Sequence, residues 1–191
     1  MVGKDVFSQI VTPVNTRVYL SVLSEKERQL YLDSLPLAEG LRKIGAFNEA
    51  EIWTKATNED TLIYCIWHKE TDEYMGYCSY QGLNSEEPHV GIELISDYQG
   101  QGYGKEVARI LIDEFFAHTG RTALYWRLFR INSRSARLAE KMGGKLILEQ
   151  SKMVDALGER AKHLTKEELE KYRNFDLLVY LITHPGKEST L

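Results

Sequence analysis

The order in which strand and helix patterns follow one another constrains this chain more than any other feature. Runs rich in β-branched and aromatic residues predict strands at 16–23, 61–68, 74–81, 89–96, 123–130, 145–152 and 175–183. Helical patterns fill the gaps at 24–35, 37–45, 103–118 and 133–142, and a capping-box signature at Thr165 and Glu168 predicts a short helix in KEELEKY. Consecutive strands favour hairpins, whereas strand–helix–strand units favour a parallel crossover. The order predicts an α/β fold (mixed α+β) whose central sheet is mixed and mostly antiparallel, with about seven strands and helices on both faces.

Length and composition indicate one soluble domain. The 191 residues are 43% hydrophobic and 27% charged, which is an ordinary balance for a single domain with a real core. We expect this domain to span 1–191, with its core at about 16–184. The net charge of -4 implies no general attraction to nucleic acid, and no apolar run is long enough to span a membrane. The N-terminus lacks the apolar core of a signal peptide, so we expect a cytoplasmic protein.

The two cysteines, Cys65 and Cys78, lie in predicted strands and have no metal-binding spacing around them. A tight turn at Thr71 and Asp72 would place them opposite each other across a hairpin. In a reducing compartment we expect two buried thiols and no metal site.

A glycine-rich stretch, QGQGYG, joins the strand at 89–96 to the amphipathic helix at 103–118. A helix start offers unpaired N–H groups and the positive end of the dipole, and glycines let a phosphate approach them closely. A simple tight turn is the alternative. The Walker pattern fails because Gln99 and Glu106 stand where it needs Gly and Ser or Thr. The dinucleotide fingerprint fails because its third glycine comes one residue early.

Two segments carry a resemblance to a known family. The stretch QGQGYG resembles the (Gln/Arg)-x-x-Gly-x-(Gly/Ala) signature of the GNAT acetyltransferase superfamily. The segment NSRSARLAEKMGG, residues 132–144, is similar to the family's second cofactor segment, and the spacing of strands and helices from 89 to 148 is similar too. Within the superfamily the chain looks most like the branch of ribosomal-protein N-terminal acetyltransferases.

The resemblance implies that acetyl-CoA binds as the acetyl donor, without a metal. The pyrophosphate would lie on the N–H groups of residues 100–105, and the pantetheine arm would pair with the end of the preceding strand. The implied cofactor-binding residues are Leu94, Ile95, Gln99, Gly100, Gln101, Gly102, Tyr103, Gly104, Lys105, Asn132 and Ser135. Taken alone, Asn132 and Ser135 also fit an ordinary helix N-terminus, with Asn132 as the N-cap.

Acetyl transfer to an amine needs a base, and Glu93 is the first candidate. It lies in the middle of a strand between apolar neighbours, where a carboxylate is costly unless it is paired or used. Alternation places His89 on the same face, and His89 is the second candidate. The alternative for Glu93 is a structural salt bridge with Arg127 or Arg130.

The proton donor for the leaving thiolate departs from the family's pattern. Many relatives have a Tyr acid in the second cofactor segment, but Ala139 occupies that position here, and Gly144 replaces the usual Phe. Ser135 is a possible substitute as a catalytic residue.

Three hypotheses compete for the function. The first is an N-acetyltransferase that transfers acetyl from acetyl-CoA to a primary amine of a protein N-terminus, a polyamine or a small molecule, by direct attack in a ternary complex. The second is a catalytically weak or inactive acyl-CoA-binding sensor or accessory protein, which the substitution at Ala139 favours. The third is an unrelated phosphate-binding domain. We expect acetyl-CoA and an amine as partners, neither nucleic acid nor membrane, and a monomer or homodimer.

Overall fold

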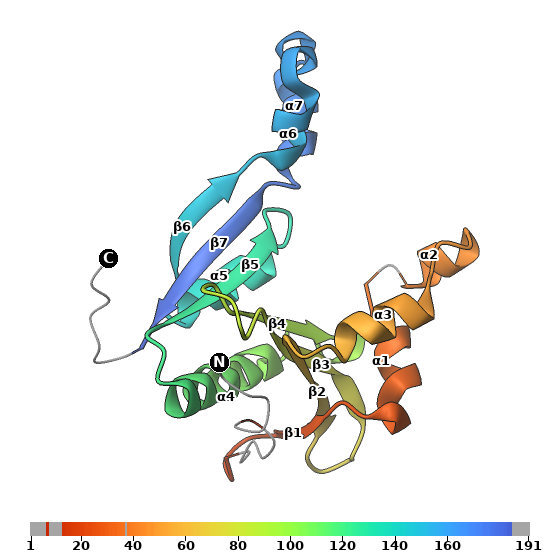
Figure 1. The fold of residues 1–191 in the computed structure, drawn as a ribbon, viewed down its shortest axis with the longest axis vertical. Coiled ribbons are helices and arrows are strands. Elements are labelled where there is room, and N and C mark those ends of the chain that lie inside the picture. Colours follow the sequence, from red (N-terminus) through yellow and green to blue (C-terminus); the bar gives the residue numbers. More distant parts are fainter. Residues whose placement is uncertain (1–6, 8–12, 37, 185–191) are drawn as a thin grey trace. The chain divides into compact units, whose positions relative to one another are not determined.

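A computed structural model describes residues 7, 13–36 and 38–184 (Figure 1). The chain divides into two compact units, Met1–Arg121 and Thr122–Leu191. Strands follow the order β1-β2-β3-β4 in the first unit and β5-β7-β6 in the second. The prediction of a mixed α/β chain with seven strands, mostly antiparallel, is confirmed.

The strands of the first unit lie within the predicted ranges, and three of the four α-helices described in it were predicted. The strands are β1 (Val18–Val22), β2 (Thr61–His68), β3 (Tyr74–Gln81) and β4 (His89–Leu94). The helices are α1 (Arg28–Ser34), α2 (Ala38–Lys43), α3 (Glu49–Ala56) and α4 (Tyr103–Thr119), with short 3-10 turns η2 (Glu25–Glu27) and η3 (Ser96–Tyr98). The predicted capping box at Ser24 is present and opens η2, which leads into α1.

One face of the first unit's sheet packs on α4. The predicted apolar stripe of this helix, Val107, Ala108, Leu111 and Phe115, is fully buried. It meets a layer of tyrosines on β2 and β3, and the Tyr80 hydroxyl donates to the Leu111 carbonyl at 2.6 Å. The Tyr80 side chain thus contributes both buried apolar area and a satisfied hydroxyl to the contact that holds α4 against this face of the sheet.

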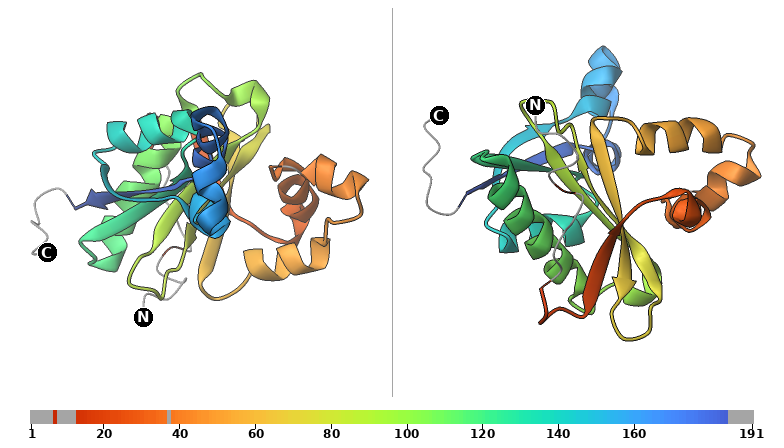
Figure 2. Two further views of the ribbon diagram at one scale, coloured as in Figure 1. Left: turned by 90° about the horizontal axis from the view of Figure 1, so that it is seen from above. Right: turned by 60° about the horizontal axis from the view of Figure 1, so that its bottom comes forward.

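The opposite face packs on α1 and α3. Tyr31, Leu32, Ala56 and Ile63 form a buried cluster, with Trp53 and Tyr77 packed against it. The ribbon shows α1, α2 and α3 on one side of β2, β3 and β4, and α4 on the other (Figure 2). The prediction of helices on both faces of the sheet therefore holds within this unit.

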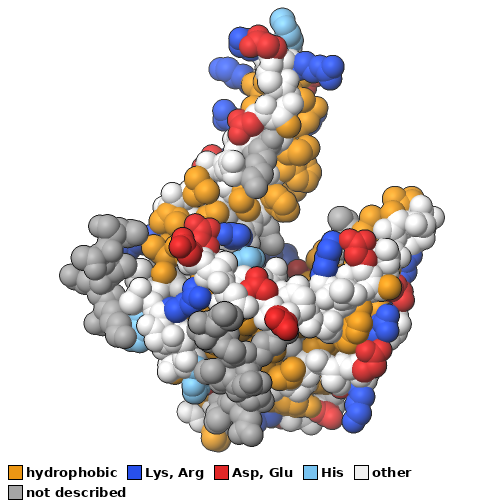
Figure 3. Space-filling view, viewed as in Figure 1, with side chains coloured by type: hydrophobic (Ala, Val, Ile, Leu, Met, Phe, Trp, Pro, Cys, Tyr) orange, Lys and Arg blue, Asp and Glu red, His pale blue; other side chains and the backbone are white. Residues whose placement is uncertain are grey.

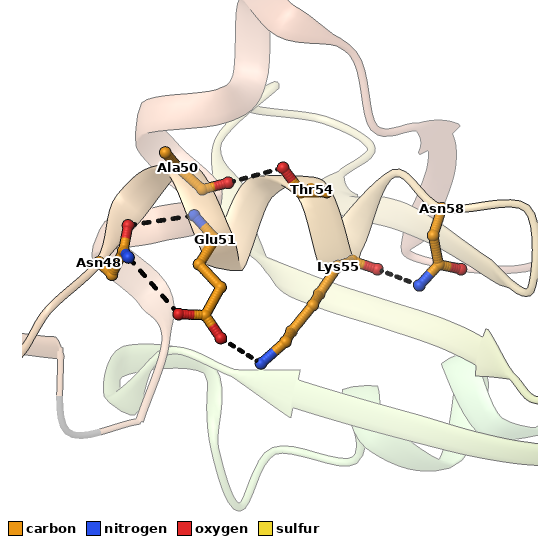
Figure 4. Close-up of polar contacts among 6 residues, drawn as sticks. All are labelled: Asn48, Ala50, Glu51, Thr54, Lys55 and Asn58. Carbon is orange, nitrogen blue, oxygen red and sulfur yellow. Dashed lines mark hydrogen bonds and ion pairs between the residues drawn. The ribbon is translucent and has the colours of Figure 1, made fainter.

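Helix α3 was not predicted from the sequence. Asn48 caps it by accepting from the Glu51 N–H at 3.2 Å, and Glu51 pairs with Lys55 at 2.6 Å (Figure 4). An Asn followed three residues later by a Glu is a helix-start signal, so this signature could have revealed the helix. Only a short apolar stripe, Ile52, Trp53 and Ala56, follows it, which makes the periodicity weak.

The predicted pairing of Cys65 with Cys78 is wrong by one residue. Cys65 lies opposite Tyr77, and Cys78 lies opposite Tyr64. The register shifts at a bulge beside Ile66 and Trp67. Because side chains alternate along a strand, a shift of one residue places the two thiols on opposite faces of the sheet. Both cysteines are free and buried, as expected.

The second unit contains β5 (Ala123–Phe129), α5 (Ser133–Lys141), β6 (Lys145–Gln150) and β7 (Leu177–Thr183). Between β6 and β7 lie α6 (Lys152–Leu157), the 3-10 turn η4 (Gly158–His163) and α7 (Lys166–Arg173). The predicted capping box at Thr165 opens α7. Strands β5 and β6 are both antiparallel to β7, so they run in the same direction with β7 between them. The crossover through α5 is therefore parallel but skips one position.

Strand β6 forms an exposed edge of the second unit. All of its residues are exposed, among them Leu146, Ile147 and Leu148. Figure 3 shows hydrophobic side chains gathered on this face near β6 and α6. No helix among the described residues is long and apolar enough to cross a membrane.

Candidate active site

The glycine-rich loop leads from the end of β4 into α4 through two residues with positive φ. Gly100 has φ 76° and Gly102 has φ 90°, both in the region that residues with a side chain rarely adopt. Gly102 is also the N-cap of α4, and no side chain caps the helix there. Two glycines of the motif are therefore required by backbone geometry, and at Gly100 nothing lies within 4 Å of the β-carbon position.

The start of α4 presents a row of free donors. Among the described groups, no hydrogen bond is made by the N–H groups of residues 100–104. The Lys105 N–H differs, because it donates to the Gly102 carbonyl at 3.0 Å. Among the described groups, the N–H groups without a hydrogen-bond partner therefore run from residue 100 to residue 104. Free N–H groups at the positive end of a helix are a binding site for phosphate.

Two glutamines brace this loop from within. The Gln99 side-chain amide donates to the Leu94 carbonyl at 2.7 Å, and the Gln101 amide donates to the Asp97 carbonyl at 2.6 Å. The Ile95 N–H donates to the Met75 carbonyl at 2.9 Å, which extends the pairing of β4 with β3. A pantetheine amide that used the Leu94 carbonyl would therefore replace the Gln99 side chain.

Glu93 lies near the end of β4, on the face opposite α4. It is directly across from Tyr77, whose ring contacts Tyr31 at a centroid distance of 4.9 Å. Burial raises the pKa of the Glu93 carboxyl. Within the first unit, no described cation pairs with this carboxylate, and no hydrogen bond to it is found there. A half-buried carboxylate that has no described partner within its own unit and lies next to aromatic rings remains a candidate general base.

His89 lies at the other end of β4, opposite Gln81. At a rise of about 3.3 Å per residue, its Cα lies about 13 Å from that of Glu93. The two candidate bases therefore share a face of the strand but are not brought together.

In the second unit, Asn132 and Ser135 lie together at the start of α5. Asn132 is the N-cap, and its Oδ1 accepts from the Ser135 N–H at 3.0 Å. The Ser135 hydroxyl oxygen accepts from the Trp126 indole N–H at 2.9 Å. Since this bond uses the hydroxyl as an acceptor, the Ser135 proton remains available to another group. The amide nitrogen of Asn132 makes no hydrogen bond among the described groups.

One departure from the family's pattern, Gly144 in place of the usual Phe, has a packing explanation. Ala139 is fully buried, and a β-carbon at Gly144 would lie 2.8 Å from the Ala139 carbonyl oxygen. The Gly144 N–H donates to the same carbonyl at 2.9 Å. The chain after α5 thus passes too close to the helix for a larger residue at 144.

Sequence reasoning missed Arg17, which contacts the glycine-rich loop. Its guanidinium pairs with Glu106 in the first turn of α4 and donates to the Gln101 carbonyl at 3.0 Å. Arg17 and Glu106 are 89 residues apart in sequence, and no local pattern connects them.

The comparison with known families decides the identity of the fold. The family described as acetyltransferase (GNAT) domain matches residues 16–145. The chain belongs to this family. The sequence-based recognition of a GNAT acetyltransferase is thereby confirmed, and the protein is an acetyltransferase by family. Proteins of this family use acetyl-CoA, and one similar structure contains CoA.

Solved structures resemble this acetyltransferase in fold at low sequence identity. A domain from Methanocaldococcus jannaschii has a TM-score of 0.63 and 16% identity, over 89% of this chain and 100% of the other. A probable GNAT acetyltransferase from Chromobacterium violaceum has a TM-score of 0.64 and 17% sequence identity, over 88% of this chain and 84% of the other. Spermidine N-acetyltransferase from Vibrio cholerae, in complex with CoA and spermine, has a TM-score of 0.65 and 13% sequence identity, over 88% of this chain and 96% of the other. No sequence among the curated proteins is significantly similar to this chain.

Proposed function

We propose that this acetyltransferase transfers an acetyl group from acetyl-CoA to a primary amine by direct attack in a ternary complex. The observation that carries the proposal is the row of free N–H groups at 100–104, held open by two glycines with positive φ at the start of α4. These donors fit a pyrophosphate. The end of β4 at Leu94 and Ile95 fits the pantetheine arm, since a strand end can pair with the amides of an extended ligand.

Glu93 supplies the base in this proposal. It accepts a proton from the acceptor ammonium, directly or through a water, and the neutral amine attacks the thioester carbonyl. A carbon–nitrogen bond forms, the carbon–sulfur bond breaks, and the CoA thiolate leaves. The attacking nitrogen releases its second proton to solvent, from which the Ser135 hydroxyl regains the proton that it gives to the thiolate. The Ser135 hydroxyl is the proposed proton donor to the thiolate, because its oxygen already accepts from Trp126. Solvent is the alternative donor.

The acceptor is a primary amine of one of several kinds. The sequence resemblance favours a protein N-terminus, as in the branch of ribosomal-protein N-terminal acetyltransferases. The fold similarity to a spermidine N-acetyltransferase supports testing polyamines in the same experiment. A small-molecule amine such as an aminoglycoside completes the panel.

Calorimetric titration with acetyl-CoA, followed by measurement of free CoA release over this amine panel, tests the proposal. We expect binding and amine-dependent release. Glu93→Gln keeps the shape and removes the base, so kcat should fall by about 10²-fold with acetyl-CoA affinity preserved. A protein that does not bind acetyl-CoA would refute the function.

A second candidate is a catalytically weak acyl-CoA-binding protein. The observation in its favour is the fully buried Ala139 at the position of the customary acid. Tight binding of acetyl-CoA without CoA release for any amine would select it over catalysis.

A further inference from the structure

Arg17 fixes the glycine-rich loop from outside it. The residue directly precedes β1, and its side chain reaches the first turn of α4. The Arg17 Nε donates to Oε1 of Glu106 at 2.7 Å, and its Nη2 lies 2.5 Å from the same oxygen. The Arg17 backbone N–H donates to the other carboxylate oxygen at 2.9 Å. One residue therefore holds both oxygens of Glu106.

The same guanidinium also determines the orientation of one peptide group in the loop. Its Nη2 donates to the Gln101 carbonyl at 3.0 Å. In a trans peptide the C=O of one residue and the N–H of the next point in opposite directions. Because the Gln101 carbonyl points toward Arg17, the Gly102 N–H points away from it. Arg17 thus aims one of the free donors at the side where an anion would bind.

An aromatic cluster supports this arrangement from beneath. The Arg17 guanidinium lies 4.0 Å from the centroid of the buried Tyr103 ring. Tyr103 in turn contacts Tyr98 and His68, each at a centroid distance of 5.9 Å. The Tyr98 hydroxyl is tied to Glu73 at 2.8 Å. The planar cation is therefore stacked on a fixed surface, which limits the positions that it can adopt.

Charge gives Arg17 a second effect on an anion. Glu106 would place a negative charge within the first turn of α4, next to the donors that a pyrophosphate would use. Such a charge repels phosphate, unless a cation neutralises it. Arg17 is the described cation that is ion-paired with Glu106.

We infer that Arg17 is a positioning residue for the pyrophosphate of acetyl-CoA, acting through Gln101 and Glu106. The inference rests on the proposed function of the loop. Both partners of the ion pair are partly exposed, with 48% and 25% of their side chains accessible, so the pair contributes little to stability. The effect of its loss should therefore appear in ligand binding and not in folding.

Arg17→Met tests the inference, with two acetyl donors compared. Acetyl-pantetheine carries the thioester without the pyrophosphate, so it does not use the loop. We expect the dissociation constant and KM for acetyl-CoA to rise about tenfold, the scale of one lost charge-assisted contact. The KM for acetyl-pantetheine, the KM for the amine, and kcat should stay at the parent values.

Three further variants sharpen the test. Arg42→Met is the matched control, because Arg42 also pairs with two carboxylates and lies 4.5 Å from an aromatic centroid, that of Phe47. It should leave acetyl-CoA binding unchanged. Arg17→Lys keeps the positive charge but loses the planar guanidinium that contacts Glu106 and Gln101 together. It should therefore give an intermediate loss of acetyl-CoA affinity. Combining Arg17→Met with Glu106→Gln removes the unpaired carboxylate and should recover part of the affinity.

The possible outcomes separate the two claims. If the parent does not bind acetyl-CoA, the proposed function fails, and this inference fails with it. If the parent binds and both Arg17 variants bind equally well, the proposed function survives and only the inference is refuted. Equal losses for acetyl-CoA and acetyl-pantetheine would also refute it, since they would show a general disturbance of the fold.

Discussion

The carbonyl oxygen of Glu93 occupies the place where a side chain on Gly76 would begin. A β-carbon at position 76 would lie 2.1 Å from that oxygen, and Gly76 has φ 136°. Position 76 therefore accepts only glycine, for two independent reasons: a β-carbon would overlap the Glu93 carbonyl oxygen, and residues with a side chain rarely adopt this φ. Through this contact β3 sets the position of the strand end that carries the candidate base.

Gly76→Ala should destabilise the protein strongly. Overlap with backbone atoms cannot be relieved by rotation of a side chain, so we expect the free energy of unfolding to fall by about 3 kcal/mol. Urea denaturation followed by circular dichroism measures this. Gly40→Ala in α2 is the control, because nothing lies within 4 Å of its β-carbon position. It should be neutral or stabilising by up to about 1 kcal/mol. Equal stability of both variants would contradict the clash.

Gly102→Val should abolish most acetyl-CoA binding while the protein stays folded. The backbone at position 102 has φ 90°, which residues with a side chain rarely adopt. The new β-carbon would also lie 3.3 Å from Nη2 of Arg17, beside the free donors. We expect the dissociation constant to rise by at least about tenfold, measured by calorimetry. Gly120→Val imposes a comparable left-handed strain, φ 64°, at the other end of α4, with open space around it. The affinity of the Gly120→Val variant for acetyl-CoA should match that of the parent protein. If Gly102→Val also bound normally, the loop would be only a turn.

Asn132→Asp separates capping from ligand binding. Aspartate can accept the Ser135 N–H as asparagine does, so the free energy of unfolding should change by less than about 0.5 kcal/mol. If the amide nitrogen donates to pantetheine, acetyl-CoA binding should weaken by about 1–2 kcal/mol. Asn48→Asp, at the N-cap of α3, is the matched control and should leave affinity unchanged. If both variants bind acetyl-CoA as the parent does, Asn132 only caps α5 and does not bind the ligand.

The raised pKa of Glu93 predicts a dependence of stability on pH. The folded state binds this proton more tightly than the unfolded state, whose carboxyl has its ordinary pKa of 4.5. The favourable contribution is therefore complete below pH 4.5 and is lost as pH rises through the folded pKa. Glu93→Gln, which does not titrate, should gain Tm relative to the parent as pH rises from 4 to 7. A Tm difference that is constant over this range would show that Glu93 is not perturbed by folding.

Arg130→Met should destabilise the second unit. Asp176 is completely buried, and its Oδ2 accepts from Arg130 Nη2 at 3.3 Å, while Arg130 also pairs with Glu149. Removal of the cation leaves a buried carboxylate, at a cost of about 3 kcal/mol. Thermal denaturation measures this, with Lys171→Met as the control, since its pair with Glu167 is exposed. Restoration of stability by adding Asp176→Asn would confirm the cause.

The sequence determined the features that depend on neighbours a few residues away. The capping boxes at Ser24 and Thr165, the apolar stripe of α4 and the glycine-rich loop all lie within one or two turns of chain, so their patterns predict them. The strand bounds are correct to within two residues for the same reason. The family followed from two such local segments.

The tertiary structure decided what depends on register and on distant contacts. A single bulge beside Ile66 placed Cys65 and Cys78 on opposite faces, which no periodicity of either strand reveals. The contacts of Arg17 with Glu106 and Gln101 join segments more than 80 residues apart, so they exist only once β1 and α4 are packed. Local patterns record which face of an element is buried, but they do not record which residue of another element it meets.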